Sequence, residues 1–406
     1  MSKAPLRRTR GDLIATGVIA AVSVIALLIA FITAPIRQDH LTPAAEEIPN
    51  GGMLAITPQS LTEGAQLHDD APSPHPLTIA GLIVTYDKSS GTISGFTPDG
   101  EEKWSYTRKP ELCGMASAWD EVVAVYRTSI GCGDVVSIKA STGQYSHTRS
   151  AIAPDEVEII SSNDRVGYVA PARTEIWRSD LVRTVEYGEV EAPQEPDFQP
   201  NEACTRTSAL TRKEFYAVTE KCDDGSWLRM QKATPEDSRK PEITQSVHIT
   251  DGSYLVAVSE DAAAVYDPTS SKVASFNQEG NELANAQVPQ SDLLSASPTG
   301  VANPEVADLP HYMSYFDGEN LMLLDPANLA VTAIFPDAVG TGFGAGDRLI
   351  YPTPQGIAVA NWDTNTIDRV IPVDRHGYSG PVSISSAGAT VVEKRGTDIA
   401  VLDLVQ

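Results

Sequence analysis

The sequence predicts an all-β fold: a β-propeller of seven blades, or alternatively eight, behind a single N-terminal transmembrane helix. The first observation is residues 120–149, in which an apolar strand, a strand of alternating character and a polar third strand follow one another through short turns. Strand and turn residues at this spacing are typical of a β-meander. A meander cannot bury its own apolar faces, so it needs neighbours of the same kind.

The second observation is that the same pattern recurs along the chain. The starts are 36 to 58 residues apart, which is the spacing of propeller blades. We count eight units and expect seven blades, because two neighbouring units can share one blade. A β-sandwich is the structural alternative, but about 350 residues of one pattern would require several sandwiches. The pattern is clear in residues 81–108, and weaker copies begin near Val166, Phe215, Tyr254, Tyr312, Arg348 and Thr390.

The third observation is an apolar segment near the N-terminus. Residues 13–34 contain no charged side chain, and as a helix they would extend about 33 Å, enough to cross a bilayer core. Residues 1–12 hold four basic residues and one acidic residue, which places this tail in the cytoplasm by the positive-inside rule. We therefore expect a single-pass protein of the inner (plasma) membrane whose C-terminal part is extracytoplasmic, in the periplasm. A cleaved signal peptide is the alternative.

Residues 35–76 follow as a segment rich in proline and acidic residues. This composition predicts a semi-extended spacer that holds the globular part away from the membrane. Within it, residues 53–57 are a possible closing strand, because the last repeat, residues 388–406, contains only two clear strands. The extracytoplasmic propeller itself is expected to span residues 77–406.

The charge balance limits the classes of partner. Positions 1–37 hold five of the 30 basic residues and one of the 54 acidic residues, so the rest of the chain carries 25 basic against 53 acidic residues. So acidic a domain is repelled by phosphate groups, which argues against nucleic acid or anionic lipid headgroups as primary ligands. The simplest interpretation of the acidity itself is a well-solvated surface.

Four cysteines fall into two local pairs, Cys113 with Cys132 and Cys204 with Cys222. Outside the cytoplasm, locally paired cysteines predict disulfide bonds. A loop of about 20 residues closed in this way contributes about 3 kcal/mol in the chain-entropy model. Zinc binding is the alternative, but the sequence has no CxxC motif and no histidine at zinc-finger spacing. We therefore expect two disulfide bonds and no metal site.

The sequence carries no strong catalytic motif. The seven histidines are scattered without an HExxH motif, and no GxSxG motif is present, which argues against a zinc protease and an α/β-hydrolase. The glycine-rich residues 340–346 lack the GKS or GKT of a phosphate-binding loop and are expected to form a turn between blades. We expect a protein without enzyme activity and without a cofactor.

The candidate ligand-binding stretch is WRSDLVRTVEYG, residues 177–188. It combines two large aromatic rings with charged side chains, a mixture that suits sugars, because rings stack on apolar sugar faces while Arg and Asp bind hydroxyls. The alternative is that both rings pack between blades and that the first arginine and the aspartate form a structural pair. The candidate residues are Trp177, Arg178, Asp180, Arg183 and Tyr187.

The chain resembles a known family in its layout and in short stretches of sequence. The layout is a basic N-terminal flank, one membrane anchor, an acidic linker and a propeller. The similar stretches lie mainly within residues 113–188: CG at 113–114 followed by Trp119, then VVAVYRT, GCG and WRSDLVRTVEYG. The family is the membrane-anchored β-propeller family of mycobacteria and corynebacteria to which polar growth factor PgfA belongs.

The resemblance implies a non-enzymatic cell-envelope assembly factor. It would bind a glycolipid such as trehalose monomycolate on the outer side of the inner membrane and work with an inner-membrane mycolate exporter in polar growth. Its partners would be the glycolipid, the exporter and the membrane around its N-terminal helix, and not nucleic acid.

Two other functions remain open. A protein-interaction scaffold of an envelope assembly complex would have no lipid ligand of its own and would expose a patch on one rim, whereas a glycolipid carrier predicts an apolar groove beside polar sugar contacts. An enzyme of the quinoprotein kind would require calcium and a quinone on the channel axis, and one of the glycosidase kind two facing carboxylates about 5–9 Å apart.

Overall fold

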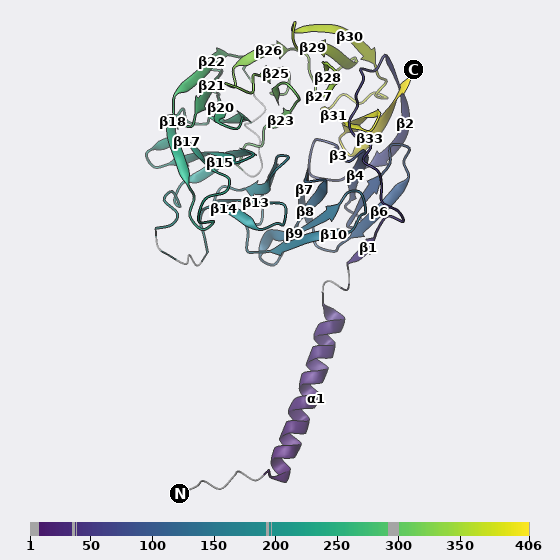
Figure 1. Cartoon of the computed structure of the whole chain (residues 1–406), viewed down its shortest axis with the longest axis vertical. Coiled ribbons are helices and arrows are strands. Elements are labelled where there is room, and N and C mark those ends of the chain that lie inside the picture. Colours follow the sequence, from purple (N-terminus) through teal and green to yellow (C-terminus); the bar gives the residue numbers. More distant parts are fainter. Residues whose placement is uncertain are drawn as a thin grey trace.

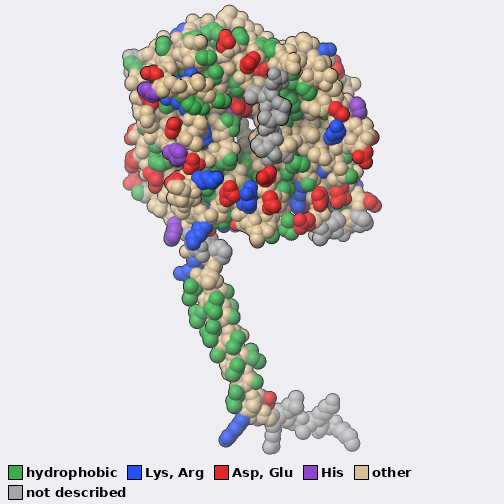
Figure 2. Space-filling model, turned by 180° about the vertical axis from the view of Figure 1, so that it is seen from behind, with side chains coloured by type: hydrophobic (Ala, Val, Ile, Leu, Met, Phe, Trp, Pro, Cys, Tyr) green, Lys and Arg blue, Asp and Glu red, His purple; other side chains and the backbone are tan. Residues whose placement is uncertain are grey.

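A computed structural model describes residues 8–34, 37, 39–191, 195, 197–290 and 300–405. The helix α1, Arg10–Thr33, is long and apolar enough to cross a membrane. Its N-terminus is capped because the Asp12 N–H donates to the Thr9 hydroxyl while the Asp12 carboxylate accepts from the Thr9 N–H. Apolar side chains cover the face of α1 that Figure 2 shows, and no residue of this helix is buried by the rest of the chain.

Eight antiparallel sheets surround one axis, so the globular part is an eight-bladed β-propeller (Figure 1). In each blade the first strand lies innermost, beside the first strands of the neighbouring blades. The strands of blades 1 to 4 are β3 Leu77–Ile79, β4 Leu82–Asp87, β5 Thr92–Phe96 and β6 Glu102–Thr107; β7 Leu112–Ala118, β8 Glu121–Thr128, β9 Gly131–Lys139 and β10 Tyr145–Ser150; β11 Glu158–Ser161, β12 Val166–Val169, β13 Arg173–Trp177 and β14 Arg183–Gly188; and β15 Thr205–Arg212, β16 Phe215–Cys222, β17 Gly225–Lys232 and β18 Ile243–Ile249.

The remaining strands complete the ring. Blade 1 has a fifth, outermost strand, β1, His40–Thr42, and blade 8 has β2, Ser60–His68, as its outer strand. The strands of blades 5 to 8 are β19 Tyr254–Val258, β20 Ala262–Asp267, β21 Lys272–Asn277 and β22 Glu282–Gln287; β23 Glu305–Asp308, β24 Met313–Phe316, β25 Leu321–Leu324 and β26 Val331–Phe335; β27 Phe343–Ala345, β28 Arg348–Thr353, β29 Gly356–Asn361 and β30 Thr366–Pro372; and β31 Val382–Ala387, β32 Thr390–Arg395 and β33 Asp398–Val405.

The predicted β-propeller is confirmed, with eight blades, the alternative number, in place of seven. Each of the eight sequence units begins in a different blade, seven of them at the second strand and the one near Tyr254 at the first. The number of blades was underestimated because some strands are short: β24 and β25 have four residues each and β27 has three. With strands this short, two closely spaced units can each form a sheet of their own.

Apolar side chains fill the spaces between neighbouring blades, and the protein has no single central core. Eight buried clusters correspond to the eight interfaces between blades. The cluster between blades 1 and 2 includes the rings of Trp104, Tyr106 and Tyr126. The cluster between blades 8 and 1, where the ring closes, is the smallest; its buried members are Ile83, Ala387, Val392, Ile399 and Val401.

The strand that closes the ring is β2, which corrects the prediction of residues 53–57. It pairs antiparallel with β33 along its whole length and alternates between exposed and half-buried residues. Leu61 and Leu67 point into the clusters on either side of blade 8. Polar residues stand between them, and the pairing shifts at Gly64, so the strand resembles a linker in sequence. In 53–57 the side chain of Leu54 is buried, but the segment forms no strand.

From Asp39 to residue 76, the described part of the predicted spacer is attached to the propeller instead. β1 pairs with β6, and the N–H groups of Ala44 and Ile48 donate to carbonyls of the β9–β10 turn at 2.9 and 2.8 Å. Asp39, just before β1, makes a 3.1 Å ion pair with Arg108. Only residues 34–38 therefore separate α1 from the first group fixed to the propeller.

Candidate functional site

Two of the five predicted ligand-binding residues are fully buried. Trp177 ends β13, and its Nε1 donates to a carboxylate oxygen of Glu175 at 2.9 Å. Tyr187 lies in β14; its hydroxyl donates to Glu220 at 2.7 Å and accepts from Asn201 at 2.8 Å. Both rings pack between blades, so neither offers a face on which a sugar could stack.

The three charged candidate residues of this stretch lie around the turn between β13 and β14. Arg178 and Asp180 form an exposed ion pair with two contacts, Nε to Oδ1 at 2.8 Å and Nη2 to Oδ2 at 2.9 Å. Arg183 instead contacts Glu186 and lies 3.6 Å from Glu175. The five residues are therefore divided between core and surface on the outer strands of blade 3, and they form no common site.

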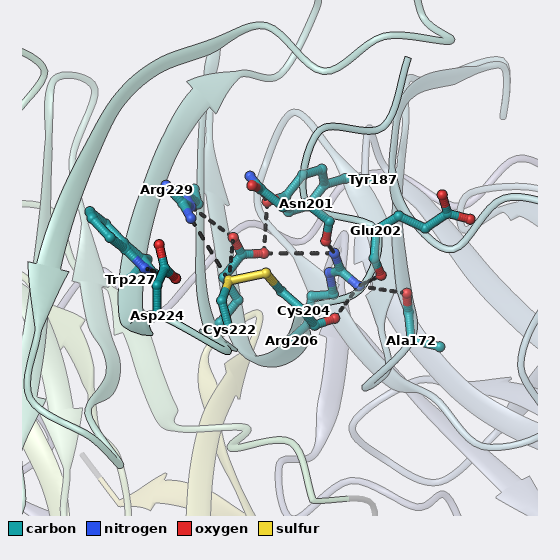
Figure 3. The surroundings of a disulfide bond; sticks show 11 residues. Ala172, Tyr187, Asn201, Glu202, Cys204, Arg206, Cys222, Asp224, Trp227 and Arg229 are labelled. Carbon is teal, nitrogen blue, oxygen red and sulfur yellow. Dashed lines mark hydrogen bonds and ion pairs between the residues drawn. A yellow bond between two sulfur atoms is a disulfide. The ribbon is translucent and has the colours of Figure 1, made fainter. Parts of the chain in front are cut away.

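A buried ion network explains why the ring of Tyr187 is covered (Figure 3). Arg206, with no exposed surface, lies 3.7 Å from Glu220, and its guanidinium sits 4.9 Å from the centre of the Tyr187 ring. It also donates to backbone carbonyls of the segment before β15, among them that of Cys204 at 2.6 Å. This segment thereby folds against the outer strand of blade 3, a contact between residues that sequence spacing could not reveal.

Both predicted disulfide bonds are present. Cys113–Cys132 joins β7 to β9 within blade 2, and Cys204–Cys222 joins the segment before β15 to the end of β16. Cys204, Cys222 and Glu220 are also the one group of possible metal ligands found among the described residues. Because both sulfurs are bonded to each other, neither is the thiolate that a metal ion would require.

The candidate site is instead a cavity on the propeller axis, which we call the axial cavity. Its volume is about 420 Å³, and residues of all eight innermost strands line it. This size lies within the range of small-molecule sites. Hydroxyl groups dominate its polar lining, and its apolar lining includes Leu210, Val256 and Ile384; the hydroxyl-bearing residues are Thr78, Ser117, Ser161, Ser162, Thr211, Ser314, Thr341 and Ser385.

A chain segment crosses one side of the central channel of the propeller, which contains the axial cavity. Residues 69–76, which we call the strap, lead from β2 at the perimeter of blade 8 to β3 at the axis. Asp69 fixes its start: one carboxylate oxygen accepts from the N–H groups of Tyr86 and Ala71, and the other pairs with buried Lys394 at 2.6 Å. Three prolines at 72, 74 and 76 stiffen the rest.

The strap forms one wall of a second cavity of about 310 Å³, the strap cavity, which also borders β7, β11 and β23. His75 lies at the boundary, since it lines both cavities. Its Nδ1 is 3.2 Å from the hydroxyl of Thr341, and its Nε2 is 3.9 Å from Oε2 of Glu305. His75 and Glu305, which are 230 positions apart in the sequence, therefore lie beside each other in the fold.

Burial changes the charge of both facing groups. It lowers the pKa of His75 to about 4, with a smaller contribution from the positive charge of Lys394, so the imidazole is neutral at physiological pH. Burial also raises the pKa of Glu305 to about 7, so this carboxyl changes charge near neutrality. Sequence analysis missed both residues, because His75 stands in an apparent linker and Glu305 in a weak repeat.

Comparison with solved structures shows the fold. The chain is similar to the crystal structure of BamB from Moraxella catarrhalis, with 12% sequence identity, a TM-score of 0.51 and coverage of 84% of this chain and 99% of that one. It is also similar to the dihydro-heme d1 dehydrogenase NirN in complex with DHE, with 13% identity, a TM-score of 0.52 and coverage of 81% and 72%. At such identities the likeness defines a fold and not a function.

No protein-family model matches the chain, and no curated protein sequence matches it either. The class of protein that fold and cavity define is an eight-bladed β-propeller with disulfide bonds, an axial cavity and one apolar helix near its N-terminus.

Proposed function

We propose that this protein is a non-enzymatic cell-envelope assembly factor that binds the sugar head of a glycolipid in its axial cavity. α1 anchors it in the inner membrane with the N-terminus in the cytoplasm, and the propeller lies on the outer side. The glycolipid is of the trehalose monomycolate kind, and the protein works with a lipid exporter in the same membrane. The identity of the lipid and the exporter rest on the resemblance of residues 113–188 and of the overall layout to the PgfA family.

The observation that carries the proposal is the composition of the axial cavity. Hydroxyl groups and apolar side chains together line a space of about 420 Å³, and so many hydroxyl groups suit a small polyhydroxylated group better than a long hydrocarbon chain. The two charged residues in its wall, Arg212 and Asp308, pair with each other at 2.7 Å. In this proposal the cavity takes only the sugar head and the acyl chains stay outside it, so the apolar groove expected of a glycolipid carrier is not part of this site.

The short connection to α1 supports access to a membrane lipid. Between Thr33, the last residue of α1, and Asp39, which is fixed by Arg108, the chain can extend about 20 Å at most. The perimeter of blade 1 therefore stays within this distance of the end of the helix. Disulfide bonds, which persist in oxidising compartments, support the placement of the propeller outside the cytoplasm.

The test is native mass spectrometry of the full-length protein in detergent micelles with added trehalose monomycolate. We expect a one-to-one adduct that Ser161→Trp abolishes, because Ser161 is exposed at the end of β11 and lines both cavities. Ser150→Trp is the matched control, since this exposed serine ends β10 on the perimeter of blade 2. Absence of an adduct, or equal loss in both variants, would refute glycolipid binding in the cavity.

A protein-interaction scaffold is the second candidate, and one observation favours it. The outer strands of blades 6 and 7 carry exposed apolar residues: Ile334 in β26 and Ile367 and Val370 in β30. A hydrogen bond of 3.1 Å from Asn365 to the carbonyl of Thr332 ties the two strands together. If this edge binds a partner, Ile367→Lys reduces cross-linking to membrane proteins while leaving the glycolipid adduct intact; unchanged cross-linking would exclude this edge.

A further inference from the structure

Glu305 lies in the wall of the strap cavity, and its side chain is about a quarter exposed. Its Oε2 atom is buried and has no hydrogen-bond partner, and His75 at 3.9 Å is too far to supply one. A buried acceptor without a donor is unfavourable. A ligand that brings a donor to this oxygen would therefore remove an unfavourable feature of the empty protein.

The strap holds the opposite side of this position in place. Asp69 and Lys394 fix its start, and the Thr341 hydroxyl contacts His75 near its end. Because the prolines and these contacts restrict the strap before any ligand arrives, little ordering entropy is lost on binding. Nε2 of His75 and Oε2 of Glu305, 3.9 Å apart, are thus two preformed polar groups that one ligand hydroxyl group could contact together.

Few charged side chains surround His75 and Glu305. Arg212 and Asp308 neutralise each other, Glu158 accepts a hydrogen bond from Asn303 at 3.2 Å, and His75 is neutral because its pKa is about 4. Glu305 is then the group in these walls that titrates near neutral pH. The titratable side chains that line the two cavities, within the described part of the chain, are His75, Glu158, Arg212, Glu305 and Asp308.

This arrangement selects among ligand classes. An anion would meet carboxylates and one already paired arginine, so phosphates and carboxylic acids are disfavoured. A permanent cation could pair with ionised Glu305, but it would make little use of the Ser and Thr hydroxyl groups that line the axial cavity. A hydroxyl group donates a hydrogen bond without carrying a charge, and the surrounding Ser and Thr hydroxyls can serve the remaining groups of the same molecule.

We propose that Glu305 and His75 form the recognition pair for an uncharged, polyhydroxylated ligand, and that the ionised form of Glu305 is the form that binds it. Glu305 accepts from ligand hydroxyls, while neutral His75 offers Nε2 to the same molecule. The inference rests on the proposed binding of a sugar head in the axial cavity, and it adds the residues and the pH dependence. His75 lines both cavities and Glu305 lines the strap cavity, so in this proposal the sugar head extends past His75 into the strap cavity. With half-ionisation at about pH 7, affinity rises about ten-fold from pH 6 to pH 8 and then levels off.

The experiment is isothermal titration calorimetry of the full-length protein in micelles at pH 6 and pH 8. The probes are trehalose, maltose, myo-inositol and, as a charged comparison, glucosamine; trehalose monomycolate is examined in parallel by native mass spectrometry. Glu305→Gln keeps the shape of the side chain but removes its titration. Glu282→Gln is the control, because Glu282 is an exposed residue that begins β22, as Glu305 begins β23.

The expected result is that at least one uncharged polyol binds about ten-fold more tightly at pH 8 than at pH 6, and that Glu305→Gln weakens binding and abolishes this difference. His75→Phe should weaken binding at both pH values equally, since His75 is neutral throughout. Glu282→Gln should behave like the wild type, which separates loss of the recognition pair from a general effect of removing a carboxyl group.

The outcomes separate this inference from the proposed function. Binding of trehalose monomycolate that is unaffected by pH and by Glu305→Gln would overturn the inference and leave the function standing. Binding of maltose or inositol that depends on Glu305, without binding of the glycolipid, would support the inference and overturn the function. Binding of glucosamine alone, or of none of the probes, would overturn the inference.

Discussion

Of the contacts that close the ring, the ion pair between Lys394 and Asp69 should be the one whose removal lowers stability most. The lysine ammonium lies 2.6 Å from Oδ2 of Asp69 and 3.2 Å from the carbonyl of Ala71, and both ionised side chains are almost fully buried. In Lys394→Met, Oδ2 of Asp69 loses the ammonium donor that it contacts. Removing one partner of a buried ion pair typically costs about 3–5 kcal/mol.

The smallest apolar cluster of the propeller lies at this interface, between blades 8 and 1, so little other burial can offset the loss. Urea unfolding of the full-length protein in micelles, followed by circular dichroism, should show a midpoint lower by about 1 M, because the slope for a domain of this size is several kcal/mol per molar. Asp69→Asn combined with Lys394→Met should recover part of the loss, because the unpaired charge is gone.

Lys213→Met is the matched control, since Lys213 pairs with Glu260 on the surface, where both side chains are about half exposed. Its midpoint should match that of the wild type, because exposed ion pairs contribute little. The reasoning would be refuted if Lys394→Met shifted the midpoint no more than this control, or if the double variant were less stable than Lys394→Met alone.

Further predictions concern closure of the ring by β2, the Cys204–Cys222 disulfide bond and the pH dependence of stability. Leu67→Asp should place a charge in the cluster between blades 8 and 1 and make β2 accessible to limited proteolysis; an unchanged cleavage pattern would exclude β2 as the essential closing strand. Replacing Cys204 and Cys222 together by serine should cost about 3 kcal/mol in urea unfolding, and an unaltered midpoint would contradict this. The pKa of Glu305 is about 7 in the folded protein, against an ordinary value of 4.5. The folded state therefore stays protonated to higher pH than the unfolded state, and the free energy of unfolding should fall by about 3 kcal/mol as pH rises from 4.5 to 7. Glu305→Gln should remove this fall in stability. His75 acts oppositely: its lowered pKa reduces stability as pH falls from 6.5 to about 4, and thermal melts of His75→Gln should lack that decline.

Local sequence was enough to predict the blades because each blade repeats a local pattern. The apolar runs of β4 and β8 stand next to turns with glycine, and this combination is specific to hairpins. The closing strand failed the same test, because β2 shows apolar residues only at alternate positions and carries Gly64 where its pairing shifts. Its identity depends on β33, which lies more than 300 residues further along the chain.

The candidate site could not be predicted for a different reason. Aromatic and charged residues suit either a binding surface or a buried network, and burial decides which one forms. For Trp177 and Tyr187 that burial comes from neighbouring blades and from the segment that Arg206 holds in place. For His75 and Glu305, proximity arises only when the ring closes and the strap crosses the channel, so no local sequence pattern encodes the pair.

The short connection between α1 and β1 also affects the effective concentration at which the propeller would meet a partner in a membrane. If α1 anchors the protein as proposed, a domain held within about 20 Å of its helix samples a thin layer next to the bilayer, where a partner in the same membrane would meet it at an effective concentration of the order of millimolar. In that arrangement the affinity of the propeller for such a partner could be low and the contact readily reversible without loss of association.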